Sequence, residues 1–260
     1  MTTLKRTPVA WRHRAIGIAL ACTALAWLAI ATRAGATEWA GPCPPCVAFD
    51  RLDKQIRDGR LPRTEARRQF ALQIAELDAC LAGDNARAAE PGRWIFPLRG
   101  YAPATAGAAQ GYVTSGYDYF DGNRHGGHPS FDLFIIDRDQ DSLDDRTGEP
   151  VTVVSMTGGI VVAAETEWAE GSPLRGGKYL WIYDPDKRLL IYYAHNRDLL
   201  VAVGDRVEPG TPIATVGRSG FNAAKRRSPT HLHLTVLEVG VGRPQPLDIS
   251  RELRTLRTLP

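Results

Sequence analysis

Short runs of β-forming residues, separated by Gly, Pro and Asp, fill the chain from Trp94 to Glu238 and constrain its fold more than any other feature. Helical spacing of apolar residues is weak in this part, whereas each run has the length and composition of a strand. The pattern predicts a mainly β fold, an antiparallel β-sheet or sandwich domain over residues 93–245, followed by a basic C-terminal tail at 246–260. The expected strands are Phe131–Ile136, Val151–Ser155, Gly159–Ala164, Tyr179–Tyr183, Leu189–Ala194, Ile213–Val216 and His231–Glu238.

Residues 47–58 and 64–82 show a helical pattern instead. In the second segment apolar side chains recur at helical spacing, and Gly83 provides a stop signal. Two helices joined by a short turn would lie antiparallel. We therefore predict a small α-helical hairpin within residues 37–90, with residues 83–92 as the linker to the β domain. The apolar positions of the second segment are Phe70, Ile74, Leu77 and Leu81.

The first 36 residues have the three parts of a secretory signal peptide. An uncharged apolar run from Ala15 to Ala31 is followed by Ala34-Gly35-Ala36, small residues of the kind that signal peptidase reads. Cleavage after Ala36 would place the mature protein in the periplasm or cell envelope, or outside the cell. The alternative is an uncleaved anchor helix, because the run is only slightly shorter than a bilayer span. The basic stretch ahead of the run carries Lys5, Arg6, Arg12 and Arg14.

The formal net charge of +3 comes from this leader. Residues 1–36 hold five of the 32 basic side chains and no acidic one, so 27 basic and 29 acidic side chains remain, a net charge of −2. The basic character therefore gives no argument for a nucleic-acid partner.

Three cysteines, Cys43, Cys46 and Cys80, remain after the leader, an odd number for an oxidising compartment. Cys43-Pro44-Pro45-Cys46 has the spacing of a redox pair, but no thioredoxin-like strand and helix follow, and a zinc site would lack a fourth ligand. An antiparallel hairpin brings Cys46 and Cys80 to the same end. We predict that one of the first two cysteines pairs with Cys80, which would stabilise the hairpin by about 3–4 kcal/mol.

Histidines gather in the β domain. His128 and Asp132 are four residues apart, in a turn and at the start of a strand, and imidazole and carboxylate groups are usual zinc ligands. His231 and His233 alternate with aliphatic residues on one strand, so both point to the same face. His195 follows another strand. Each feature alone has an ordinary structural explanation, but together they indicate a metal site.

In this order and spacing, the histidines make the β domain similar to the lysostaphin-type (LytM) zinc endopeptidases of peptidoglycan. The resemblance covers Trp94–Glu238, including the glycine-rich segments Gly148–Ala164 and Val203–Gly220. The family signature is carried by His128 and Asp132, by His195 after Tyr192-Tyr193-Ala194, and by His231-Leu232-His233.

The resemblance implies one catalytic zinc ion. His128, Asp132 and His233 would bind the metal, and His195 and His231 would be the catalytic residues beside an open, water-filled position. Three protein ligands and an open position are what catalytic zinc requires. Histidine suits the proton transfers because its pKa lies near neutral pH. One histidine would assist the water and the other would stabilise the oxyanion, with the two roles left unassigned.

Two positions depart from the family pattern. Ser130 and Phe131 stand where a Gly and an aliphatic residue are usual, which predicts a changed cleft floor with the metal ligands intact. Some members of the family lost their ligands and became activators of other wall hydrolases, whereas this chain keeps all five positions. His125 lies outside the pattern and is expected to bond a loop carbonyl, with a place in the cleft as the alternative.

Two weaker signals concern charged loops. Asp137, Asp139, Asp141 and Asp145 alternate like the ligands of a calcium loop, although the usual Gly and the bidentate Glu are missing. A solvated acidic loop is the alternative. Lys225-Arg226-Arg227 precedes the second histidine cluster and would steer substrate carboxylates if it borders the cleft, or would form a solvated basic loop.

The function expected from the resemblance is hydrolysis of peptide cross-links in peptidoglycan. The partner is then a wall peptide, with no nucleic acid, and with a membrane only through an uncleaved leader. The alternatives are a catalytically silent envelope regulator and a secreted protease with another substrate. The cleaved bond, a D-Ala–diamino acid link or a glycine bridge, the role of the hairpin and the oligomeric state stay open.

Overall fold

The computed structural model describes residues 43–82, 94–106, 111–240 and 243–260. The predicted signal peptide at 1–36, the linker at 83–92 and the two ends of the hairpin region, 37–42 and 83–90, lie outside these residues. Among the helices of the described residues, none is both long and apolar enough to span a membrane.

The predicted hairpin is present as α1 (Pro44–Arg57) and α2 (Arg63–Ala82). Two prolines open α1, where their missing N–H groups cost no hydrogen bond. Each helix buries one apolar stripe at helical spacing. The buried side chains are Cys46, Phe49, Leu52, Asp53 and Ile56 in α1 and Ala66, Phe70, Ile74 and Leu77 in α2.

The other described residues form a nine-stranded antiparallel sheet with two short helical segments, and the sequence pattern predicted an antiparallel β fold. Its main order is β1-β8-β5-β4-β3-β6, while β7 pairs with β2 and β5, and β9 pairs with β8. The elements are η1 (Tyr119–Arg124), β1 (Ser130–Phe134), β2 (Thr152–Val154), β3 (Gly159–Glu165), β4 (Lys178–Asp184), β5 (Leu189–Leu199), β6 (Arg206–Val207), β7 (Pro212–Val216), β8 (His231–Val239), β9 (Pro244–Pro246) and α3 (Ser250–Leu253).

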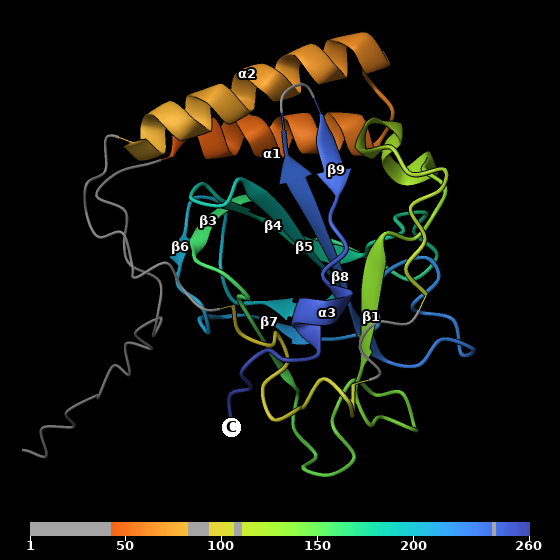
Figure 1. Ribbon diagram of the computed structural model, residues 1–260. Helices are drawn as coiled ribbons and strands as arrows, with labels where there is room; N and C mark the ends of the chain where they lie inside the picture. Colours follow the sequence, from red (N-terminus) through yellow and green to blue (C-terminus); the bar gives the residue numbers. More distant parts are fainter. Residues whose placement is uncertain (1–42, 83–93, 107–110, 241–242) are drawn as a thin grey trace, which may run out of the picture. The chain divides into compact units, whose positions relative to one another are not determined.

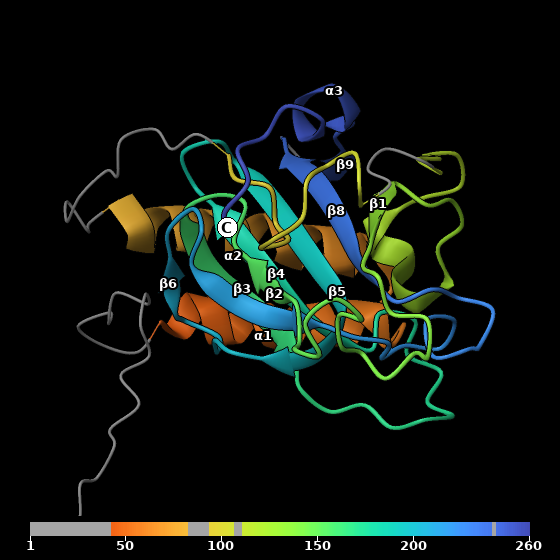
Figure 2. The ribbon, with the colours of Figure 1, turned by 90° about the horizontal axis from the view of Figure 1, so that it is seen from below.

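The two faces of the sheet carry separate apolar clusters. Alternate residues of β4 show this, because Leu180 and Ile182 belong to one cluster whereas Trp181 and Tyr183 belong to the other. The cluster with Trp181 and Tyr183 also contains the buried stripes of α1 and α2. Figures 1 and 2 show the two helices side by side on this face, with α3 on the other side of the sheet. The hairpin is thus a layer of the fold.

The predicted disulfide to Cys80 is wrong. Cys43 and Cys46 pair with each other at the start of α1, and Cys80 is a free, partly buried thiol. The helices differ in length, 14 residues against 20, so the end of α2 runs beyond the start of α1. At ~1.5 Å per residue this overhang amounts to about 9 Å, which carries Cys80 past its expected partners.

The C-terminal segment, predicted as a tail over residues 246–260, packs against the β domain. Ile249 and Leu253 are buried in the cluster on the face away from the hairpin. The backbone N–H of Phe96 donates to the carbonyl of Arg257, and that of Gly100 donates to the carbonyl of Leu259. The two ends of the domain therefore close on each other.

Candidate metal centre

Strand register brings the two halves of the histidine pattern together. β1 and β8 pair so that Asp132 lies directly opposite His233, and β5 places Ala194 opposite His233 on the other side. Leu232 and Leu234 of β8 are buried in the core, while His231 and His233 line a cavity on the hairpin face. The predicted alternation of faces along this strand is confirmed.

His128, Asp132 and His233 form a group that could hold a metal ion. Each offers one ligand atom, and the three atoms lie within 4.8 Å of one another. Oδ1 of Asp132 is 3.3 Å from Nε2 of His128 and 3.0 Å from Nδ1 of His233. Two imidazole nitrogens and a carboxylate oxygen are a donor set that zinc favours. The second ring nitrogen of His128 donates to the carbonyl of Gly111 at 3.1 Å, which fixes the ring orientation.

His195 and His231 stand beside this group. Their ring centroids are 4.9 Å apart, and that of His195 is 5.3 Å from that of His233. Nδ1 of His195 donates to the carbonyl of Ser219 at 2.8 Å, and Nδ1 of His231 donates to the carbonyl of Pro229 at 2.7 Å. With Nδ1 occupied as the donor, a neutral ring keeps Nε2 as a proton acceptor.

A distortion of β5 positions His195. The predicted strand ends at Ala194, but β5 continues to Leu199 with irregular register on both sides of the histidine. His195 has φ +66°, and its N–H donates to the carbonyl of Gly176 at 2.9 Å. Such irregularities redirect side chains and often lie beside active sites. A strand-length pattern alone could not have predicted this one.

Gly220 leaves the room that His195 needs. A Cβ at this residue would lie 2.7 Å from Nδ1 of His195 and would overlap the carbonyl oxygen of Arg175. The φ of Gly220, +113°, is also one that other residues rarely adopt. The glycine-rich segment ahead of β8 therefore lets the backbone approach the histidine closely.

The charged groups of the site stabilise one another. Burial raises the pKa of Asp132, but hydrogen bonds from His128 and His233 outweigh it and hold that pKa well below its usual range. The hydrogen bond to Asp132 raises the pKa of His128. Burial lowers the pKa of His233, and burial followed by the neighbouring histidines lowers that of His195 well below its usual value. The carboxylate is therefore ionised and ready to bind a cation.

The metal group lies in a cavity of about 310 Å³ that the hairpin helps to form. Asp53, Ile56 and Arg57 of α1 line it together with a set of aromatic side chains. The sequence predicted a helix over residues 47–58, but it could not indicate that one face of this helix reaches the site. The aromatic lining residues are Tyr117, Tyr119, Tyr179, Trp181 and Tyr192.

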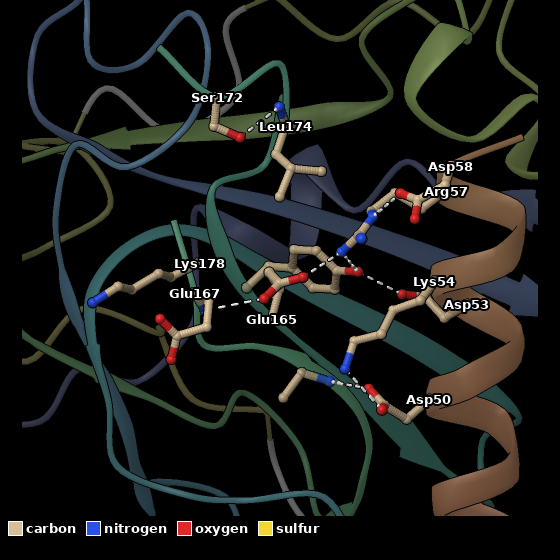
Figure 3. A network of polar contacts seen from close by, with 12 residues as sticks. Asp50, Asp53, Lys54, Arg57, Asp58, Glu165, Glu167, Ser172, Leu174 and Lys178 are labelled. Atoms are coloured by element: carbon tan, nitrogen blue, oxygen red, sulfur yellow. Dashed lines mark hydrogen bonds and ion pairs between the residues drawn. The ribbon is translucent and has the colours of Figure 1, made fainter. Parts of the chain in front are cut away.

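Polar contacts attach α1 to the cavity wall (Figure 3). The hydroxyl groups of Tyr119 and Tyr179 donate to the two oxygens of Asp53 at 3.0 and 2.7 Å. Burial raises the pKa of Asp53 to about 6. Arg57 forms an ion pair with Glu165 at 2.6 Å. These contacts fix the helix against β3, β4 and η1.

The remaining site predictions have mixed outcomes. Nδ1 of His125 bonds the carbonyl of Gly126 at 2.9 Å, and the ring also lines the cavity, so both expectations hold. Ser130 lines the cavity and shares a 2.7 Å hydrogen bond with Thr235. Phe131 is buried on the opposite face, so it does not shape the cleft floor.

The calcium prediction finds no support. Asp137, Asp139 and Asp145 gather, but Asp141 instead accepts a hydrogen bond from the N–H of Leu143. Oδ2 of Asp137 accepts hydrogen bonds from the N–H of Ser142 and the hydroxyl group of Thr230. Such hydrogen bonds order the acidic loop without an ion.

The basic loop borders the cavity, but its charges point elsewhere. Asn222, Ala223 and Ser228 line the cavity, whereas Arg226 and Arg227 are exposed outside the lining. Lys225 lies over the ring of Phe221 at 3.8 Å.

Residues 141–245 match the family model described as peptidase family M23. The match contains His195, His231 and His233. It begins after His128 and Asp132, which the fold brings to the same site. No curated protein sequence matches the chain.

Three solved structures are among those similar to the chain. A zinc-containing peptidase from Vibrio cholerae is 21% identical over 66% of this chain and 46% of that one, with a TM-score of 0.38. Lysostaphin from Staphylococcus simulans is 19% identical over 62% and 54%, with a TM-score of 0.39. A LytM protein from Ruminococcus gnavus is 24% identical over 76% and 73%, with a TM-score of 0.43. The chain thus spans about half the length of the first two proteins.

Proposed function

We propose that this chain, whose residues 141–245 match the model of peptidase family M23, is an exported zinc metalloendopeptidase that hydrolyses peptide cross-links of peptidoglycan. The observation that carries the proposal is the convergence of His128, Asp132 and His233 with two further histidines on one cavity. Export and an envelope location, expected from residues 1–36, are part of the same proposal.

The three ligand residues fit one zinc ion. Their donor atoms face one another from a loop and two paired strands, and the cavity leaves the site open on one side. An open side is what separates catalytic zinc sites from structural ones. When bound, zinc lowers the pKa of a water molecule and polarises the scissile carbonyl group.

His195 and His231 handle protons and charge in this proposal. Each ring is held by a carbonyl oxygen at Nδ1, so Nε2 is the nitrogen that can accept a proton from water or, once protonated, donate to the developing oxyanion. Neither ring can turn without breaking its hydrogen bond. The pair therefore supplies two preorganised groups beside the metal ligands.

The cavity wall suits a peptide. Aromatic side chains from η1, β4 and β5 line it, together with Ile56 of the hairpin. Such walls give apolar contact area and exclude water, while a few polar groups fix the orientation of the ligand. We propose that the hairpin is a permanent wall of the substrate cleft, because its buried stripes belong to an apolar cluster of the sheet.

The test uses mature protein, residues 37–260, incubated with purified cell-wall sacculi, with and without a chelator. Released fragments are identified by mass spectrometry. Cross-linked dimers should fall to monomers only when zinc is present, and His231→Ala should lower the rate about 10²- to 10⁴-fold. His125→Ala is the matched control, because this histidine lines the same cavity outside the proposed set.

Three other outcomes would change the proposal. Zinc binding without release of fragments from sacculi, or from any peptide, would favour the silent regulator. Cleavage of unrelated peptides but not of sacculi would favour a protease with another substrate. Equal losses in His231→Ala and His125→Ala would show that the assigned set is wrong.

A further inference from the structure

Two arginines line the cavity, and they differ in how their charge is balanced. Arg57 forms ion pairs with Glu165 at 2.6 Å and with Asp58 at 2.7 Å, so its charge is neutralised (Figure 3). Arg175 has no carboxylate among its interactions within the described parts of the chain. Among the described residues, Arg175 is therefore the cation of the cavity lining that has no anionic partner.

Arg175 is held firmly at the cavity wall. Its Nη1 donates to the carbonyl of His125 at 2.7 Å, and its backbone N–H donates to the side-chain oxygen of Asn123 at 3.0 Å. The next residue, Gly176, accepts the N–H of His195, and a Cβ there would overlap the hydroxyl group of Tyr192. The segment that carries Arg175 is thus locked to β5 and to the catalytic histidine.

The free part of the guanidinium group is suited to a carboxylate. Arginine has five N–H donors in a planar fork, and the structure uses one of them for His125. A fork of this kind recognises carboxylates through two parallel hydrogen bonds. The positive charge of Arg175 is also felt inside the cavity, since it adds to the effect of burial in lowering the pKa of His125.

The size of the cavity limits where that carboxylate can be attached. A volume of about 310 Å³ is at the small end of ligand pockets. His195 and His233 line the same cavity as Arg175. A carboxylate that reaches Arg175 must therefore sit close to the bond that faces the histidines.

We propose that Arg175 is a specificity-determining residue, which binds a carboxylate on the carbon that also carries the scissile amide nitrogen. Resting on the proposed function, this assigns the substrate class as cross-links made through a diamino dicarboxylic acid. In such a cross-link, the carbon that carries the amide nitrogen also carries a free carboxylate. Lysine and glycine-bridge acceptors have no charged group there.

The test compares three peptide dimers that differ only in the acceptor residue: diaminopimelate with a free carboxylate, the same residue with that carboxylate amidated, and lysine. Wild-type enzyme should cut the first with a kcat/KM about 10- to 100-fold higher than the others, the range expected for a hydrogen bond between charged groups. Arg175→Gln should bring this ratio close to one, chiefly through a higher KM for the first dimer. Arg175→Lys should give an intermediate ratio.

Two controls separate local recognition from general effects. Glutamine keeps a donor for the His125 carbonyl, and the comparison is a ratio of substrates, so a loss of folded enzyme affects all three dimers alike. Arg226→Gln removes an exposed arginine outside the cavity lining and should leave the ratio unchanged. An equal effect of the two substitutions would overturn the proposal.

Binding to metal-free protein gives a second readout. The monomeric peptide with a free diaminopimelate carboxylate should bind more tightly than its amide in titration calorimetry, and Arg175→Gln should remove the difference. If no dimer is cut, the proposed function fails and calorimetry still decides the role of Arg175. If dimers are cut without preference for the carboxylate, the role of Arg175 is wrong while the peptidase function stands.

Discussion

Asp132 and His233 face each other across β1 and β8, with Oδ1 of the carboxylate 3.0 Å from Nδ1 of the imidazole. His128 approaches the same oxygen at 3.3 Å from the loop before β1. The carboxylate is thus the centre of the ligand group, and metal binding should depend on it more than on any residue outside the group.

Asp132→Asn tests this dependence. The amide keeps the size of the side chain but removes the negative charge that attracts a cation, so we expect the zinc content to fall from about one ion to a small fraction, and the activity by at least 10²-fold. Metal analysis by mass spectrometry checks the content. Asp53→Asn provides a control for loss of a cavity carboxylate, and it should retain the metal.

The raised pKa of Asp53 predicts a pH-dependent stability. Its pKa is about 6 in the folded protein and near 3.8 when unfolded, so both states are protonated well below pH 3.8 and ionised well above pH 6. Between these limits the unfolded state ionises first, and the free energy of unfolding should fall by about 3 kcal/mol in total on account of this group, about 2 kcal/mol of it between pH 4 and 6. Urea unfolding of metal-free protein at several pH values should show a shallower decrease for Asp53→Asn. Parallel curves for the two proteins would contradict the prediction.

Gly220→Ala should damage the site without removing the proposed metal ligands. The new Cβ would press on His195 and on the Arg175 carbonyl, which should cost about 1–3 kcal/mol of stability and lower the activity at least tenfold. Gly171→Ala is the matched control, because Gly171 also has a positive φ, +87°, but nothing lies within 4 Å of its Cβ. If both variants lose the same activity, backbone strain alone is responsible. Zinc content and thermal unfolding complete the comparison.

The disulfide assignment predicts one free thiol in the mature protein. Thiol titration of unfolded, oxidised protein should modify Cys80 and leave Cys43 and Cys46 joined in one peptide. Cys80→Ser should change the free energy of unfolding by less than about 0.5 kcal/mol, as for a substitution outside a bond or a packed core. A disulfide-linked peptide containing Cys80 would instead support the pairing of Cys80 with Cys43 or Cys46 that the sequence predicted.

The sequence was informative where a local rule decides the structure. Alternation along a strand sufficed to place His231 and His233 on one face, and helical spacing identified Phe70, Ile74 and Leu77 in the buried stripe of α2. These local rules could not predict which side chains meet across the fold, because that depends on contacts between segments that are distant in the sequence. The approach of α1 to Tyr179, the irregularity at His195 and the unpaired charge of Arg175 all belong to this second kind. The cysteine prediction failed for a local reason, because the unequal lengths of α1 and α2 carry Cys80 past Cys43 and Cys46.

The docking of α1 on β3 and β4 also determines when, during synthesis of the chain, the cavity can form. Asp53 emerges early from the ribosome, its partner Tyr179 much later, and the segment around Arg257 that closes the domain comes last of all. A chain that ends before Thr235 lacks part of the cavity lining, and one that ends before Arg257 still lacks the segment that closes the domain. We therefore expect hydrolytic capacity to arise only when the whole polypeptide has been delivered and folded, which would keep unfinished molecules harmless to the cell that makes them.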